Sequence, residues 1–518
     1  MQQTFLDIIY KIFYDTAQRD FKDVKLLLSE KFSYPSIKFE PQIEVKIPIP
    51  KKTMNGLLYS GYFFEDSTQE QAAWGFFLAT VYHLAAHVAV SNYSIYKKWT
   101  KHKNPRIFWK VIDFIEDDAV RRYLSSTNPD IWTNISQIHK EFERHNNPKE
   151  IESNFAVKLA SKKLNSIKEQ MKNEPLLCFD REHENNVLDW ASELYKNQKI
   201  LHKAPPFFYE QRNSNQSLIL KKNKIELFTS GKFKNTINKL NFLYYEEKER
   251  LEYILHKIRK DTVGLNFDEI SLPSEDIFEY YQLKEKNKKI ITKIREQIRT
   301  VYNNSEDPQN NFYGEIDLEL AIQAIASNSE RYAEVFNKTE EQRIEETWAI
   351  LVDNSASLRL RFEAVKDFML CLAEASDELT GPSGSWGLYS YDQKFSILKD
   401  HRGKYNQDVR ARLGGLRSGG LSYTPDAILL AGRMLAKNPA ELKHLFVFTD
   451  DFPTGLWNYD QKLYLAIKDV ERIGVEVIGI GLSSNISKYF SDSCWGINIR
   501  DLVNKFVRIY RMKSSKFL

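Results

Sequence analysis

The sequence predicts an α/β fold of the doubly wound type at its C-terminus, preceded by a mainly α-helical N-terminal region. Two observations support this. After about residue 340, continuous apolar runs alternate with helical stretches, which is typical of a mostly parallel sheet with helices on both faces. Before that point, apolar residues recur at three- and four-residue spacing, as on one face of a helix. A chain of 518 residues is too long for one ordinary core, so we expect several domains.

Three regions are expected. Residues 1–205 are predicted to form a mainly helical domain, with a short extended piece at 43–52 where two prolines exclude helix. Within it, a long apolar helix is expected to begin at Ser67. Residues 206–340 are predicted to form a linker and a helical hairpin, and residues 341–518 the α/β domain.

The elements of the α/β domain follow from its apolar runs. Four runs are predicted to be strands: 348–352, 385–391, 443–449 and 475–481. Three stretches between or after them are predicted to be helices: 359–377, 425–437 and 459–473.

The composition excludes several classes of protein. The 74 Lys and Arg nearly balance the 70 Asp and Glu, so no nucleic-acid partner is expected. The three cysteines Cys178, Cys371 and Cys494 lie far apart, which indicates neither a disulfide framework nor a thiolate zinc site. We see no signal peptide and no uninterrupted apolar stretch of about 18 residues, so we expect a cytoplasmic protein without membrane insertion.

Hard oxygen ligands follow two of the predicted strands. Asp353 ends the first strand and is followed at two-residue steps by Ser355 and Ser357, and Asp450 ends a later strand. Ligands of doubly wound sheets bind at the carboxyl ends of the strands. Two carboxylates there would repel each other, and a cation such as Mg²⁺ or Mn²⁺ would relieve this, with hydroxyls as neutral ligands. The alternative without a metal is that these side chains only cap the next helix.

A glycine-rich loop lies between the two acids. The segment "DVRARLGGLRSGGLSYTPDAILLAGRML" (408–435) delivers Thr424 just before a helix. The order Asp, Ser, Ser, Thr, Asp resembles the von Willebrand factor A domain and its metal-ion-dependent adhesion site (MIDAS). This resemblance assigns residues 341–518 to such a domain.

The resemblance also implies roles for these residues. Ser355 and Ser357 would bind the metal directly, Thr424 directly or through water, and Asp353 and Asp450 mostly through water. The sixth coordination position would be left for a partner's carboxylate. The family commonly has Gly after the second acid, where this chain has Asp451, whose carboxylate would alter affinity or point to solvent.

A second resemblance covers roughly residues 312–512. The stretches "YGEIDLELAIQAIASN", "WAILVDNSASL" and "ILKDHRGKYNQDVRARLGGLRSGGLSYTPDA" are similar to the C-terminal half of the NorD and CbbO group of activation proteins. These work with MoxR-type AAA+ ATPases, which form hexameric rings, to mature or reactivate metalloenzymes and other complexes. The resemblance implies a non-catalytic adaptor between such an ATPase and a client. The chain has no G-x-x-x-x-G-K-[ST] motif, so it is not itself a P-loop ATPase.

The N-terminal region holds a second candidate metal site. His83 and His87 are four residues apart and share one helix face, and a following helix carries Glu116 and Asp117. His83, His87 and Glu116 are the ligand types of a zincin-type zinc site. Leu84 stands where a zincin has its catalytic acid, so no general base is available.

Two alternatives to a non-catalytic zinc site stay open for this cluster. The first is a metal-dependent hydrolase of zincin descent that uses His83, His87 and Glu116. The second is that the histidines only pack between helices, with Glu116 and Asp117 paired to Arg121 or Arg122.

Overall fold

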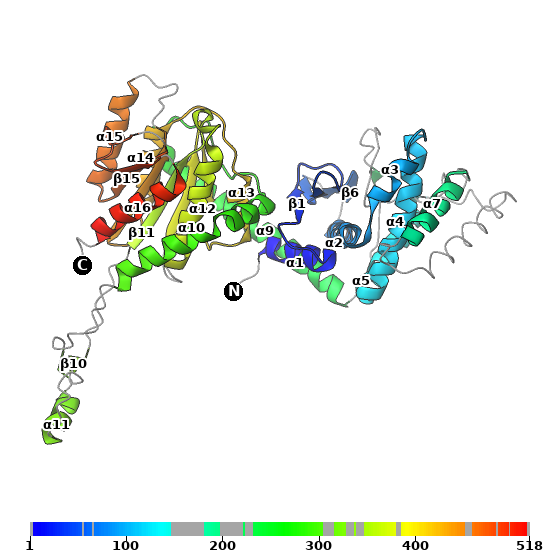
Figure 1. Ribbon diagram of the computed structural model, residues 1–518, viewed down its shortest axis with the longest axis horizontal. Coiled ribbons are helices and arrows are strands. Elements are labelled where there is room, and N and C mark those ends of the chain that lie inside the picture. Colours follow the sequence, from blue (N-terminus) through cyan, green and yellow to red (C-terminus); the bar gives the residue numbers. More distant parts are fainter. Residues whose placement is uncertain are drawn as a thin grey trace. The chain divides into compact units, whose positions relative to one another are not determined.

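The computed structural model describes the chain except for short gaps and three longer ones. The described residues are 4–53, 56–64, 67–146, 181–196, 221–222, 231–303, 315–316, 318–327, 336–337, 346–379, 385–450, 458–482, 485–496 and 498–514. They divide into two compact units (Figure 1): Met1–Arg250 with Asp276–Phe278, and Leu251–Glu275 with Glu279–Leu518. The unit boundary therefore lies within helix α9 (Gly231–Arg259) and at the start of α10 (Ile277–Asn303), and not at residues 205 and 340 as predicted.

The first unit is mainly helical. Its helices, besides most of α9, are α1 (Phe5–Ala17), α2 (Ser67–Val90), α3 (Tyr96–Trp99), α4 (Pro105–Thr127), α5 (Pro129–Asn146) and α7 (Arg181–Lys196). It also holds strands that the sequence analysis missed, apart from the extended piece at 43–52. They form a sheet of order β1-β3-β2 and one of order β4-β5-β6-β7. Their bounds are β1 (Val24–Ser29), β2 (Ser36–Lys38), β3 (Ile43–Pro48), β4 (Lys51–Thr53), β5 (Gly56–Tyr59), β6 (Tyr62–Phe64) and β7 (Lys221–Lys222).

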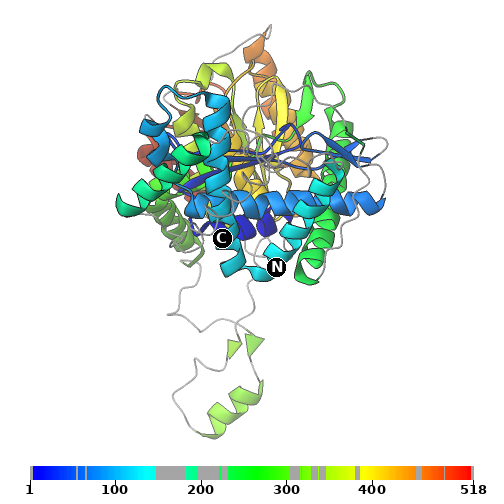
Figure 2. The same cartoon turned by 90° about the vertical axis from the view of Figure 1, so that its right-hand side faces the viewer.

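Helix α2 is the core helix of this unit, and Figure 2 shows it as the long blue helix that runs across the view. It is apolar on all sides, which is typical of a helix surrounded by protein. Its segment Glu70–Val90 is long and apolar enough to cross a membrane, but 83% of the most apolar window is buried within the fold. Its aromatic residues pack on α1, where the rings of Phe5 and Trp74 lie 6.0 Å apart.

The second unit is built on a seven-stranded sheet of order β16-β15-β14-β11-β12-β13-β8. Its strands are β8 (Glu269–Ser271), β11 (Glu346–Asp353), β12 (Trp386–Tyr391), β13 (Lys394–Lys399), β14 (Leu442–Thr449), β15 (Glu476–Leu482) and β16 (Asp492–Gly496). Strand β11 lies between β12 and β14 and runs parallel to both. The four predicted strands correspond to β11, β12, β14 and β15, and β8, β13 and β16 were missed.

The sheet is mixed, and not wholly parallel. Strands β12 and β13 are antiparallel because the turn at residues 392–393 joins them directly as a hairpin. The helices of the unit, besides α10, are α11 (Leu318–Ala326), α12 (Phe362–Leu379), α13 (Gln407–Gly415), α14 (Thr424–Ala436), α15 (Tyr459–Arg472) and α16 (Ile499–Ser514). The three predicted helices correspond to α12, α14 and α15.

Alternate residues of β11 face opposite sides of the sheet, and helices cover both sides. Ala349 and Leu351 belong to a buried cluster with residues of α14 and α15. On the other side, the ring of Trp348 lies 5.2 Å from that of Tyr510 in α16, and Phe368 of α12 lies 4.7 Å from Phe448 of β14. This packing is consistent with the predicted doubly wound arrangement (Figure 1).

Helix α10 packs on α12, although its sequence was predicted to belong to a separate hairpin region. The Asn287 amide donates to the Asp367 carboxylate at 2.6 Å, and Lys284 pairs with the buried Glu374 at 2.8 Å. Because buried carboxylates require such partners, we conclude that α10 belongs to the α/β unit.

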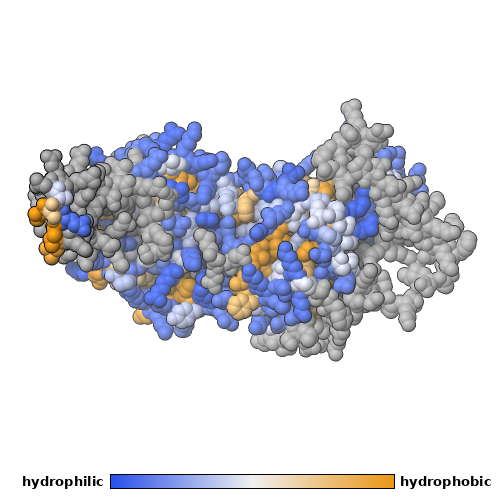
Figure 3. All heavy atoms as spheres, turned by 90° about the horizontal axis from the view of Figure 1, so that it is seen from below, coloured by the Kyte–Doolittle hydropathy of each residue, from blue (hydrophilic) through white to orange (hydrophobic). Residues whose placement is uncertain are grey.

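Helix α11 carries an exposed apolar face. Leu318, Ile322 and Ile325 recur at helical spacing and are 73%, 64% and 73% exposed. Figure 3 shows this face as an orange patch at the left-hand edge of the view. The two-residue strand β9 (Glu315–Ile316) precedes α11 in the sequence, and the two-residue strand β10 (Phe336–Asn337) follows it. The two strands pair antiparallel.

A buried histidine makes the stability of the second unit depend on pH. His444 of β14 lies 3.2 Å from both Glu346 and Glu476. Burial alone would lower its pKa, but the two carboxylates raise it from 6.5 to about 9. A raised pKa stabilises the fold fully below pH 6.5, and this stabilisation is lost as the pH rises through 9.

We therefore expect wild-type protein to lose stability between pH 6.5 and 9, by at most about 3 kcal/mol, since one pKa unit corresponds to about 1.4 kcal/mol. His444→Gln should show no such loss. Thermal unfolding of both proteins across this range measures it, and parallel curves for the two would contradict this role of His444.

Candidate functional site

Asp353 is the centre of a hydrogen-bonded cluster at the carboxyl end of β11. Its side chain is fully buried. One carboxylate oxygen, Oδ1, accepts from the backbone N–H of Ser355 at 2.8 Å. The other, Oδ2, accepts from the hydroxyls of Ser422 at 2.9 Å and Thr449 at 3.2 Å. The carboxylate is therefore held rigidly at the strand end.

The two serines that follow Asp353 lie side by side. Their hydroxyl oxygens are 2.9 Å apart, with Ser355 buried and Ser357 exposed. Ser355 precedes the short 3₁₀ helix Ala356–Leu358, but its side chain makes no capping hydrogen bond. The structure thus disagrees with the alternative that this serine only caps a helix.

Thr424 reaches the same cluster from the first position of α14. Its hydroxyl accepts from the Tyr391 hydroxyl at 3.2 Å and lies 2.9 Å from that of Ser422. The preceding residue, Tyr423, is the N-cap of α14 and makes no side-chain capping bond. Thr424 is fully buried, so its hydroxyl is directed into the site and not to solvent.

Asp450 supplies the second acid. It directly follows β14, is partly buried, and follows Thr449, whose hydroxyl contacts Asp353. Burial and then the negative charge of Asp450 raise the pKa of Asp353 to about 6, against the opposing hydrogen bonds of Ser355 and Ser422. The two carboxylates therefore repel each other. Asp451 lies outside the described residues.

The loop before α14 is fastened to the loop after β11 by backbone hydrogen bonds. Ala356 N–H donates to the Gly420 carbonyl at 3.0 Å, and Gly419 N–H donates to that of Asn354 at 2.8 Å. The Asn354 amide donates to the Arg417 carbonyl at 3.1 Å. These bonds hold the serines and Thr424 together.

The structure thus brings four of the five predicted oxygen donors, Asp353, Ser355, Ser357 and Thr424, into one hydrogen-bonded cluster. The fifth, Asp450, acts on Asp353 through its charge. The cluster also includes Ser422, Thr449 and Tyr391, which the sequence analysis missed. The sequence contained a signal for Ser422, because Ser422 and Thr424 have the same two-residue spacing as Ser355 and Ser357.

Residues 348–453 match the von Willebrand factor type A domain family. This part of the chain is a von Willebrand A domain. Domains of this family commonly bind a divalent metal at a MIDAS.

Solved structures similar to the chain include other proteins with such domains. The SpRpn10 VWA domain is 20% identical, with 31% of this chain and 95% of that one covered and a TM-score of 0.26. The PilB minor pilin from Streptococcus sanguinis is 12% identical over 36% of this chain, with a TM-score of 0.28; the chain spans 64% of that protein's length. Proximal thread matrix protein 1 from the mussel byssus, with a zinc-occupied MIDAS motif, is 14% identical, with 32% and 47% covered and a TM-score of 0.27. No curated protein sequence matches the chain.

The donor set at the end of β11 fits a small, hard divalent cation. Its described side-chain donors, Asp353, Ser355, Ser357, Thr424 and Asp450, are all oxygens. Oxygen ligands are those that Mg²⁺ and Mn²⁺ prefer. A cation would also relieve the repulsion that raises the pKa of Asp353.

Gly420 makes the loop conformation possible. Its φ is +71°, and a Cβ at this position would lie 2.9 Å from Cγ of Asp392. A left-handed conformation costs a non-glycine residue about 1–2 kcal/mol. We therefore expect Gly420→Ala to move the loop and to weaken Mg²⁺ binding by about tenfold, as measured by titration calorimetry.

The neighbouring Gly419 provides a matched control. A Cβ there would meet no atom within 4 Å, and its φ is not in the left-handed region. Gly419→Ala should bind Mg²⁺ like wild type, and equal affinities of the two variants would contradict the role of Gly420.

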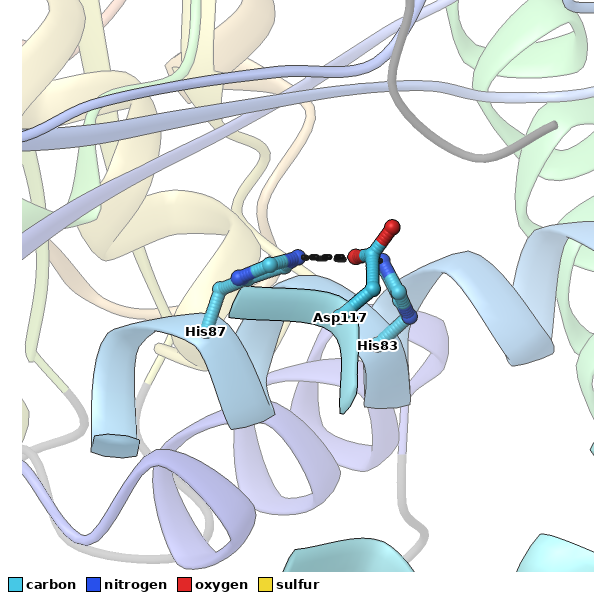
Figure 4. A group of neighbouring side chains, drawn as sticks. All are labelled: His83, His87 and Asp117. Atoms are coloured by element: carbon cyan, nitrogen blue, oxygen red, sulfur yellow. Dashed lines mark hydrogen bonds and ion pairs between the residues drawn. The ribbon is translucent and has the colours of Figure 1, made fainter. Parts of the chain in front are cut away.

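The histidine pair of the first unit also forms a cluster, but with a different acid from the one predicted. His83 and His87 of α2 face Asp117 of α4 (Figure 4). The Nε2 atoms of His83 and His87 lie 3.2 and 3.0 Å from Asp117 Oδ1 and 3.1 Å from each other. Burial alone would raise the pKa of Asp117, but the two histidines lower it well below its ordinary value.

Glu116 is not the third member of the cluster. Successive helical residues point about 100° apart, so only one of Glu116 and Asp117 can face the histidines. The carboxylate of Glu116 instead accepts from the Tyr96 hydroxyl at 2.8 Å. The predicted pairing of Glu116 or Asp117 with arginines is also wrong, because the residue that pairs with Arg121 and Arg122 is Asp118.

Proposed function

We propose that this protein is a metal-dependent adaptor, and not an enzyme, that links a MoxR-type AAA+ ATPase to a client protein complex in the cytoplasm. The von Willebrand A domain would bind Mg²⁺, or Mn²⁺, through the MIDAS residues Asp353, Ser355, Ser357, Thr424 and Asp450. The observation that carries this proposal is the convergence of these hydroxyls and carboxylates at one strand edge.

The chemistry of the donors explains why such an ion would bind a partner. Ser355, Ser357 and Thr424 are neutral, so the bound ion keeps much of its positive charge. Ser357 is exposed, whereas Ser355 and Thr424 are buried. An acidic side chain of a partner can therefore approach from the Ser357 side and complete the coordination.

This contact would select a partner without supplying the whole affinity. One hydrogen bond or contact to a charged group contributes about 1.5–3 kcal/mol, whereas a stable complex needs a larger interface. The metal site then acts as a latch within that interface.

The choice of ATPase and client rests on the similarity to NorD- and CbbO-type proteins, which is strongest in the loop that carries Thr424. The helical N-terminal unit, which lies outside the matched domain, would hold the client. The ATPase would supply the energy for remodelling, since this chain has no P-loop sequence.

Affinity purification from native lysate tests this proposal. The tagged chain is recovered in Mg²⁺ and in EDTA, and the retained proteins are identified by mass spectrometry. We expect a hexameric AAA+ ATPase to be retained in Mg²⁺ and lost in EDTA. Absence of any AAA+ ATPase under both conditions would overturn the adaptor function.

A further inference from the structure

We propose that His83, His87 and Asp117 form a zinc site that joins α2 to α4 inside the N-terminal unit. The site is independent of the MIDAS. The proposal rests on three potential ligand atoms, one from each residue, that lie within 3.2 Å of one another.

The separations of these atoms fit one tetrahedral ion. Ligand atoms bound to zinc at about 2.0–2.1 Å in a tetrahedron lie about 3.3–3.4 Å apart. The three observed separations are 3.0, 3.1 and 3.2 Å. An expansion of the triangle by a few tenths of an ångström accommodates the ion.

The surroundings of His87 orient its ring for metal binding. Its Nδ1 lies 2.8 Å from the Ser91 hydroxyl, which allows Nδ1–H to donate and leaves the lone pair on Nε2. Ser91 in turn hydrogen-bonds to the buried Glu116, which also accepts from Tyr96. Such a second layer of polar groups fixes the tautomer of metal-binding histidines.

Hydrogen bonds alone leave this cluster incompletely satisfied. Both Nε2 atoms approach the same oxygen, Asp117 Oδ1, while the buried Oδ2 has no hydrogen-bond partner. If only one Nε2 carries a proton, that proton is shared between Asp117 Oδ1 and the other Nε2 at 3.1 Å, and the lone pair of the second nitrogen faces the carboxylate oxygen. A cation pairs with both lone pairs and with the carboxylate at once, which removes this conflict.

The ligand types favour zinc over Mg²⁺ and Ca²⁺. Two imidazoles and one carboxylate suit Zn²⁺, whereas Mg²⁺ and Ca²⁺ prefer oxygen ligands only. The fourth position would be filled by water. The side chains of His83 and His87 are nearly fully buried and Leu84 offers no general base, so the ion would stabilise the packing of α2 on α4 and would not catalyse hydrolysis.

Elemental analysis of the full chain tests this site. The chain is stripped of metal, loaded with Zn²⁺ and dialysed, and its zinc is compared with that of His87→Gln and Asp117→Asn, which keep the approximate side-chain volume. We expect about one zinc per wild-type chain and loss of about tenfold or more in zinc affinity in each variant. Circular dichroism shows whether the variants fold.

Two control variants separate this site from other histidines and from the MIDAS. His102→Asn removes an exposed histidine of the same unit. The φ of His102 is +64°, a conformation that asparagine tolerates. Asp353→Asn disables the metal site of the von Willebrand A domain. Both should retain the zinc. Loss of the zinc in Asp353→Asn would assign the zinc to the MIDAS and overturn the proposed His83–His87–Asp117 site. This outcome does not depend on whether the adaptor function is correct.

Cobalt provides a readout that does not depend on whether the His87→Gln and Asp117→Asn variants fold. Co²⁺ added to metal-free Asp353→Asn protein should give the intense visible absorption of a four-coordinate site, and Zn²⁺ should displace it. Absence of this absorption would contradict the proposed zinc site. Preferential retention of Fe²⁺ over Zn²⁺ by the same metal-free protein would contradict it as well.

Discussion

Asp353→Asn is expected to weaken Mg²⁺ binding by the von Willebrand A domain about tenfold to hundredfold while the sheet stays folded. The substitution keeps the size of the side chain but removes its charge, and a contact to a charged group contributes about 1.5–3 kcal/mol. Because burial and then Asp450 raise the pKa of Asp353 to about 6, the charged form is disfavoured in the metal-free domain, and we expect the domain to stay folded with the neutral side chain. Titration calorimetry with Mg²⁺ and thermal unfolding without it measure the two effects.

Asp426→Asn is the matched control. Asp426 lies in the first turn of α14, two residues after Thr424, and pairs with Asn266 at 3.4 Å and not with the oxygen cluster. It should bind Mg²⁺ with nearly wild-type affinity. An Asp353→Asn protein with unchanged affinity would show that the metal site lies elsewhere.

Trp348→Ala is expected to destabilise the von Willebrand A domain by about 3–5 kcal/mol, as is usual for truncation of a buried large aromatic residue. The Trp348 ring is 1% exposed and makes edge contacts with Phe446 at 5.4 Å and Tyr510 at 5.2 Å. Its loss would leave a cavity between β11 and α16. Hydrogen exchange of the β14 amides reports this free energy without requiring the whole chain to unfold in one step.

Leu360→Ala removes an apolar side chain that is 99% exposed. Such surface changes usually alter stability by less than about 0.5 kcal/mol. Similar exchange rates in Trp348→Ala and Leu360→Ala would mean that the packing of Trp348 contributes little to the domain.

The central strands and the oxygen cluster were predictable because their signals are local. Strand β11 is a continuous apolar run that ends in Asp353, as expected for a strand buried on both faces. Parallel strands place their carboxyl ends at one edge, so the order of the acids and hydroxyls in the sequence predicted that they would lie together.

Other features depend on contacts that a local pattern does not contain. Strand β8 is three residues long, with Ile270 as its single buried residue, and it joins the sheet only by pairing with β13. The choice between Glu116 and Asp117 depends on how α4 is rotated about its axis relative to α2. That rotation is set by the connection between the helices and by their packing, and not by the spacing within either one.

The binding of the purified chain to its purified AAA+ ring, in Mg²⁺ and in EDTA, tests the metal latch directly. A contact of about 1.5–3 kcal/mol corresponds to about a tenfold to hundredfold change in Kd. We predict that EDTA weakens wild-type binding by this factor and that Thr424→Ala weakens it in Mg²⁺ without unfolding the domain. Equal Kd values for wild type in Mg²⁺ and in EDTA would contradict a metal-mediated contact.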